Sequence, residues 1–206
     1  MTVAQRITQL MLLAGGVVLP TLAEAAAFFL VPDRTLTPGQ RLGLQQAALA
    51  LAEGRAAPAQ FCVRAAEICG EHGEPAASLL YAKLTNELSP QPGMPSLLSD
   101  PTLTCEMRLA SDYPAVWLLP ALARSGLAHC FLADEISYVA DLGGFARVLD
   151  ALIAAGVAMP GHTLWVDYHS PRTSEALRKG VDAAIFVDAR RLRRDLALWR
   201  LMPLPA

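Results

Sequence analysis

The sequence predicts an α/β protein in which a small parallel sheet of three or more strands follows a helical hairpin region. In the carboxyl-terminal half, short continuous apolar runs alternate with amphipathic segments, which is typical of a parallel sheet covered by helices on both faces. In the amino-terminal half, residues 32–88 show helical periodicity with start and stop signals. A proline-rich linker at 89–101 separates the two, so the α/β domain is expected over 102–206.

The first 26 residues have the layout of a secretory signal peptide. Arg6 precedes an apolar run from Ile7 to Ala23, and Pro20 stands shortly before a triplet of small residues and glutamate at 23–25. A positive residue, an apolar stretch and a small-residue cleavage site define such a peptide. We therefore expect residues 1–26 to be a signal peptide or a membrane-associated helix, since the apolar run can also span a bilayer. A buried helix of a cytosolic domain is the remaining alternative.

Three helices are expected in the amino-terminal region. Thr37 can cap the first helix, and Gln40 completes a capping box three residues later. The second helix is expected over 58–70, and the third runs from the turn at 72–75 to about Leu88. The second and third helices together form the predicted helical hairpin.

The carboxyl-terminal region predicts alternating strands and helices. The expected strands are 129–134, 163–168 and 183–187, and the expected helices are 115–123, 144–155, 170–180 and 190–201. Crossover connections between parallel strands are right-handed, so these strands should lie parallel in one sheet. Proline and glycine at 89–101 are expected to exclude regular structure from the linker.

The ends of these strands carry the candidate catalytic residues. Open parallel sheets bind ligands beyond the carboxyl ends of their strands. The expected strands end at Asp134, at Asp167 with His169, and at Asp188. Carboxylates that converge there can serve as acid and base or hold a divalent cation. The competing interpretation is that these residues only cap helices and form turns.

A candidate anion-binding segment follows Asp167. Its residues are Ser170, Arg172, Thr173 and Ser174, at the start of an expected helix. Free backbone N–H groups at a helix start, hydroxyls and a guanidinium suit a phosphate or carboxylate. The sequence contains no phosphate-binding loop, dinucleotide fingerprint, zinc-protease motif or nucleophile elbow, so no metal site is predicted and the cofactor is left open.

The chain has four cysteines, Cys62, Cys69, Cys105 and Cys130. In an exported protein these are disulfide candidates, with three pairings open. Cys62 and Cys69 are seven residues apart, which on one helix is two turns, or about 10 Å. That distance is beyond the reach of a disulfide.

Charge gives two expectations about partners. The net charge of −2 gives no reason to expect nucleic acid. Four arginines near the end of the chain are candidates for a contact with an anionic surface: Arg190, Arg191, Arg193 and Arg194. A solvated helix face is the simpler interpretation of this cluster.

These observations lead to one main hypothesis of function and two alternatives. The main hypothesis is an exported accessory protein, periplasmic or membrane-anchored, that acts without catalysis through protein–protein association in a cell-envelope assembly. The first alternative is a small α/β hydrolase or phosphate-handling enzyme with a carboxylate and anion site at the carboxyl ends of the strands. The second is a cytoplasmic subunit of a larger assembly.

Overall fold

The computed structural model describes residues 7–203 and confirms the predicted α/β class. Five parallel strands form one sheet in the order β3-β2-β1-β4-β5. The strands are β1 (Gln9–Leu13), β2 (Glu106–Ser111), β3 (Ile136–Tyr138), β4 (Thr163–Asp167) and β5 (Asp182–Ile185). The prediction of a parallel sheet with three or more strands is therefore confirmed. The sequence analysis did not predict β1 and β2, which lie in the middle of this sheet.

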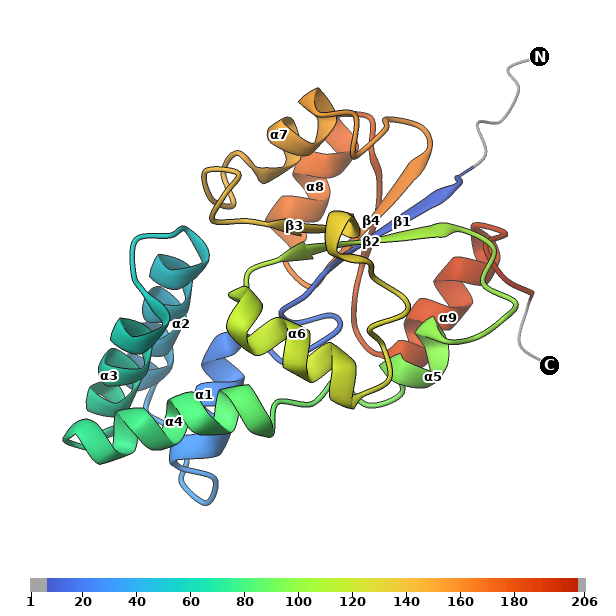
Figure 1. The fold of residues 1–206 in the computed structure, drawn as a ribbon. Coiled ribbons are helices and arrows are strands. Elements are labelled where there is room, and N and C mark those ends of the chain that lie inside the picture. Colours follow the sequence, from blue (N-terminus) through green and yellow to red (C-terminus); the bar gives the residue numbers. More distant parts are fainter. Residues whose placement is uncertain (1–6, 204–206) are drawn as a thin grey trace, which may run out of the picture.

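Helices surround this sheet on three sides (Figure 1). They are α1 (Leu22–Leu30), α2 (Pro38–Ala52), α3 (Pro58–Cys69), α4 (Glu74–Asn86), α5 (Met94–Leu98), α6 (Ala115–Arg124), α7 (Val148–Ala154), α8 (Ser170–Arg178) and α9 (Ala189–Leu198). Helices α7 and α8 cover one face of the sheet, and α5, α6 and α9 cover the other. Helices α1 to α4 form a separate helical layer beyond the carboxyl ends of the strands.

The central strand consists of residues that the sequence analysis assigned to a signal peptide. Residues 10–13 have no exposed surface, and β1 pairs with β2 on one side and β4 on the other. A strand buried on both faces has a continuous apolar sequence, which is also the pattern of a signal peptide. The prediction of a signal peptide or membrane-associated helix over 1–26 is therefore wrong for residues 7–26, while residues 1–6 lie outside the described range.

This correction removes the basis of the predicted export. Between residues 7 and 203, the structure has no helix that is long and apolar enough to cross a membrane. The main hypothesis of a periplasmic or membrane-anchored accessory protein rested on the leader, so it loses its support.

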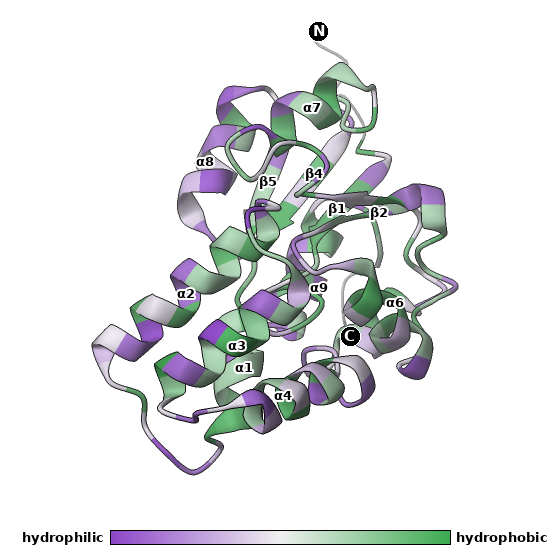
Figure 2. Ribbon diagram, turned by 60° about the vertical axis from the view of Figure 1, so that its left-hand side comes forward, coloured by the Kyte–Doolittle hydropathy of each residue, from purple (hydrophilic) through white to green (hydrophobic). Residues whose placement is uncertain are grey.

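The helical layer follows the local signals of the sequence. Helix α2 begins with the predicted capping box, in which Thr37 and Gln40 bind each other's backbone N–H groups. Helix α1 begins with a second capping box, between Thr21 and Glu24. Helices α2, α3 and α4 contain both polar and apolar residues (Figure 2), and each helix buries apolar ones, among them Leu44, Phe61 and Leu80.

Three predicted boundaries need correction. Helix α5 lies inside the supposed linker at 89–101, because Pro95 stands in its first turn, where a missing N–H costs nothing. The predicted strand at 129–134 is a turn and a short 3₁₀ helix, and β3 begins only at Ile136. The sheet also extends beyond 102–206, since its central strand β1 comes from the start of the chain.

The predicted disulfides are wrong as well, because all four cysteines are free thiols. Cys62 and Cys69 are buried in α3, and Cys130 is buried after α6. Burial raises the pKa of the Cys62 thiol to about 12 and that of Cys105 to about 11, so both stay protonated at neutral pH. These cysteines therefore act as small apolar side chains.

The arginines of α9 are partly used within the chain. Arg191 forms an ion pair with Asp195 at 3.1 Å, and Arg193 forms one with Asp100 at 2.8 Å. The contact of this cluster with an anionic surface remains a prediction, as does the association with a protein partner.

Replacement of a β1 side chain tests the corrected assignment. We expect Leu12→Ala to lower the free energy of unfolding by about 2–5 kcal/mol, because Leu12 has no exposed surface and its surroundings relax only partially into the cavity. Leu198→Ala is the matched control, since that side chain is 75% exposed and should change stability little. Urea denaturation measures both. Equal stability of the two variants would contradict the placement of β1 in the core.

Candidate functional site

The strand order of the sheet predicts where a ligand binds. The chain builds β2 and β3 on one side of β1, then crosses to build β4 and β5 on the other. In open α/β sheets the crevice at such a switch point, outside the carboxyl ends of the strands, is the usual binding site. A cavity of about 1030 Å³ lies at this position, between the sheet and the helices α1 and α2.

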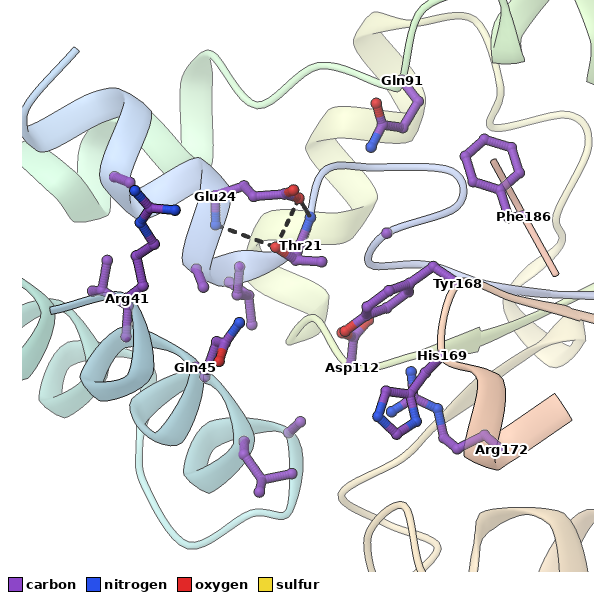
Figure 3. A pocket seen from close by; sticks show the side chains of 18 of the residues that line it. Thr21, Glu24, Arg41, Gln45, Gln91, Asp112, Tyr168, His169, Arg172 and Phe186 are labelled. Atoms are coloured by element: carbon purple, nitrogen blue, oxygen red, sulfur yellow. Dashed lines mark hydrogen bonds between the residues drawn. The ribbon is translucent and has the colours of Figure 1, made fainter. Parts of the chain in front are cut away.

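The two walls of the cavity differ in chemistry. Asp112, Tyr168, His169 and Arg172 lie together on the sheet side (Figure 3). The helical layer faces them with three polar side chains, which are Glu24, Arg41 and Gln45. The sheet side therefore holds the titratable groups that can do chemistry, and the helical layer can contact the far end of a ligand.

Asp112 is the carboxylate that follows β2, one of the two neighbours of the central strand. It follows β2 directly and is only 8% exposed. The backbone N–H of Gly15 donates to its Oδ1 at 2.7 Å. Burial raises the pKa of Asp112 to about 6, against the lowering effects of this hydrogen bond and of Arg172. Asp112 therefore exchanges a proton close to neutral pH, as an acid–base catalyst must.

The other carboxylates that line the cavity have structural roles. Glu24 accepts hydrogen bonds from the backbone N–H and the hydroxyl of Thr21, both at 2.8 Å, in the capping box of α1. Asp188 caps α9 by accepting from the backbone N–H of Arg191 at 2.7 Å. Among the described residues that line the cavity, Asp112 is thus the carboxylate not engaged in a helix cap.

Two glycines after β1 make room for this arrangement. A Cβ at Gly15 would lie 2.4 Å from Oδ2 of Asp112, and a Cβ at Gly16 would lie 2.1 Å from the ring of Tyr168. Gly16 also has φ +83°, which favours glycine. The side chains of Asp112 and Tyr168 therefore pack directly on the glycine backbone. The chain after the central strand supplies the Gly15 N–H to the site but no side chain.

Asp167 and Arg172 form a buried ion pair beside Asp112. Asp167 ends β4 with no exposed surface, and the Arg172 side chain is 16% exposed. Arg172 donates from Nε to Oδ2 of Asp167 at 2.5 Å and from Nη2 to Oδ1 at 2.8 Å. The backbone N–H of His169 donates to the same Oδ1 at 2.8 Å. This bidentate geometry fixes the guanidinium in the cavity wall.

Two aromatic rings pack against the same guanidinium. Its central carbon lies 4.3 Å from the centre of the Phe145 ring and 5.2 Å from that of Tyr168. Burial tends to lower the pKa of Arg172, but its hydrogen bonds to Asp167 and Tyr168 raise the pKa overall. Arg172 therefore stays charged at every physiological pH.

The structure separates the predicted catalytic residues. Asp167, His169 and Asp188 lie at the predicted edge of the sheet, and His169 and Asp188 line the cavity. Burial, with the nearby Arg172, lowers the pKa of His169, so the imidazole is neutral at pH 7. Asp134 does not join them, because it is exposed in the 3₁₀ helix that precedes β3, at the other end of the sheet.

Of the four residues in the predicted anion-binding segment, only Arg172 lines the cavity. Arg172 lines the cavity, but Ser170 and Ser174 are exposed and do not line it. The Thr173 side chain is buried, and its hydroxyl donates to the backbone oxygen of Ser170 at 2.8 Å, within the first turn of its own helix. Within residues 7–203, no group of three or more histidine, cysteine or acidic side chains is placed to hold a metal ion.

Comparison with known proteins gives a fold but no family. No protein-family model matches the chain, and no curated protein matches it. Among solved structures, it is similar to L-2-haloacid dehalogenase from Xanthobacter autotrophicus with chloropropionic acid covalently bound. The two share 19% identity over 96% of this chain and 85% of that one, with a TM-score of 0.65.

Two further solved structures that are similar to this chain contain magnesium. A HAD family enzyme from Bacteroides thetaiotaomicron, in complex with magnesium and inorganic phosphate, is 15% identical over 88% of this chain and 95% of that one (TM-score 0.57). A HAD-hydrolase from Bacillus subtilis bound to magnesium is 16% identical over 93% of this chain and 99% of that one (TM-score 0.60). The chain thus has the fold of HAD-like hydrolases.

Substitution of Gly15 tests the close approach at the site. We expect Gly15→Ala to lower the free energy of unfolding by about 1–3 kcal/mol, because the new methyl group overlaps the Asp112 carboxylate. The matched control is Gly39→Ala in α2, where a Cβ meets nothing within 4 Å and better helix propensity should stabilise slightly. Thermal unfolding measures both variants, and an unchanged Gly15→Ala midpoint would contradict the packing of Asp112 on Gly15.

Proposed function

We propose that the protein is a hydrolase of a small organic anion, with Asp112 as general base and Arg172 as the anchor of the anionic group. One observation carries this proposal: Asp112 and Arg172, from different elements, line the same cavity at the switch point of the sheet. The fold supports the hydrolase class. The similar structures contain chloropropionic acid in one case and inorganic phosphate in another, and both are small anions.

The geometry supports a simple hydrolytic step. The guanidinium of Arg172 binds an anionic oxygen of the substrate with N–H groups that Asp167 does not use. The ionised carboxylate of Asp112 removes a proton from water, and the water oxygen attacks the electrophilic atom of the substrate. The leaving group departs with the bonding electron pair, and Asp112 returns the proton to it or to solvent. The Gly15 N–H holds one carboxylate oxygen in place throughout.

A second candidate function is ligand binding without turnover. The bare backbone at Gly15 and Gly16 favours it, because the central strand adds no side chain and Asp112 must act alone. The two candidates differ in one measurable property. A hydrolase releases product, whereas a binding protein shows only saturable affinity for the same anions.

Replacement of Asp112 tests the hydrolase directly. We expect wild-type protein to release halide or phosphate from a panel of 2-haloalkanoic acids and small phosphate monoesters. Asp112→Asn should lower kcat by about 10²–10⁴-fold, because it removes the base while keeping the shape. Asp134→Asn is the matched control, since that carboxylate is exposed and away from the cavity.

The pH dependence gives a second readout of the same residue. Since the pKa of Asp112 is raised to about 6 and the ionised form is active, kcat/KM should rise with pH through about 6 and then level off. In Asp112→Asn this rise should disappear. Turnover that survives Asp112→Asn with an unchanged pH profile would contradict Asp112 as the base, and absence of turnover with retained binding would favour the second candidate.

A further inference from the structure

The similar solved structures raise the question of what supplies positive charge in this site. Two of them contain magnesium, one together with phosphate. A magnesium ion needs octahedral coordination at about 2.0–2.1 Å and is usually held by one or two carboxylates and several waters. Asp167 and Asp112 are the carboxylates at this edge of the sheet that could meet that requirement.

Asp167 cannot serve a metal without losing its present partners. Its two oxygens accept three hydrogen bonds, two from Arg172 and one from the His169 backbone. A metal ion at these oxygens would have to displace the guanidinium. It would also have to approach a fixed positive charge that Phe145 and Tyr168 hold in place.

The neighbouring strands offer no replacement ligands. After β1 the chain runs through Gly15 and Gly16, where any side chain would overlap Asp112 or Tyr168. Asp112 has Oδ1 held by the Gly15 N–H, and within residues 7–203 it belongs to no group of three or more histidine, cysteine or acidic side chains that could hold a metal ion. The residues present therefore do not fit a magnesium ion.

The same guanidinium has the properties that the metal would supply. It is a permanent cation in the cavity wall, and two of its five N–H groups are used by Asp167 and one by Tyr168, which leaves the others for a ligand. The start of α8 lies beside it and adds positive potential from the helix dipole. Arginine binds carboxylate and phosphate oxygens in a planar, two-pronged geometry.

We infer that Arg172 is the cation of this site and that the cavity binds a small oxyanion, carboxylate or phosphoryl, without a divalent metal. This inference deepens the proposed function but does not require turnover. Asp167 is then a positioning residue, which holds the guanidinium by Nε and Nη2 and leaves to the ligand the N–H groups that neither Asp167 nor Tyr168 uses.

Isothermal titration calorimetry on the full chain tests the inference. We expect inorganic phosphate or propionate to bind equally well with a chelator and with added magnesium chloride, and magnesium chloride alone to give no binding heat. A phosphate response with no propionate response identifies a phosphoryl site, and the reverse identifies a carboxylate site. Affinity that appears only with magnesium, or no affinity for either anion, would overturn the inference.

Variants of Arg172 complete the test. Arg172→Lys keeps the charge but loses the two-pronged geometry, so we expect about 10-fold weaker anion binding. Because removal of the arginine alone leaves Asp167 buried without its partner, the double variant Asp167→Asn with Arg172→Gln removes both charges and should stay folded but lose binding. Arg64→Ala, at an exposed arginine in α3 that does not line the cavity, should bind as wild type.

These outcomes separate the inference from the proposed function. Metal-free anion binding without product release would sustain the inference and contradict the hydrolase. Product release that depends on magnesium would support the hydrolase and contradict the metal-free binding of the anion. Unchanged anion affinity in the folded double variant would overturn the role of Arg172 in either case.

Discussion

The buried ion pair between Asp167 and Arg172 is the interaction on which the site depends. A carboxylate with no exposed surface is tolerated only with a partner, and loss of one member of such a pair costs about 3–5 kcal/mol. The pair joins the end of β4 to the first turn of α8, which places Tyr168 over Gly16 and His169 at the cavity. One interaction thereby fixes the local fold and the position of the charged group that faces a ligand.

The second constraint is the bare end of the central strand. Because Gly15 and Gly16 carry no side chains, Asp112 and Tyr168 lie directly over the backbone where the strand order reverses. The chemistry of the site therefore comes from the strands on either side of β1. The similar solved structures share the architecture, but the residues of this chain decide what the cavity can bind.

The sequence predicted what local signals determine. Helix α2 was predicted because its capping box at Thr37 is a short-range motif, and β4 because its apolar run ends cleanly at Asp167. The central strand was misread because a strand buried on both faces has no alternation to distinguish it from a leader. Strand β2 was missed because its first residues are partly exposed and include Glu106, and Asp112 was missed with it. The pairing of Arg172 with Asp167 across a helix start depends on tertiary geometry that spacing alone does not reveal.

The central claim is that an arginine takes the role of a metal ion in this cavity. Anomalous scattering from a crystal soaked in manganese chloride and phosphate tests it most directly, because manganese replaces magnesium at oxygen sites and can be located unambiguously. The account predicts phosphate density against the outer edge of Arg172 and no anomalous peak beside Asp167. A manganese peak at the Asp167 carboxylate, with Arg172 displaced, would contradict it.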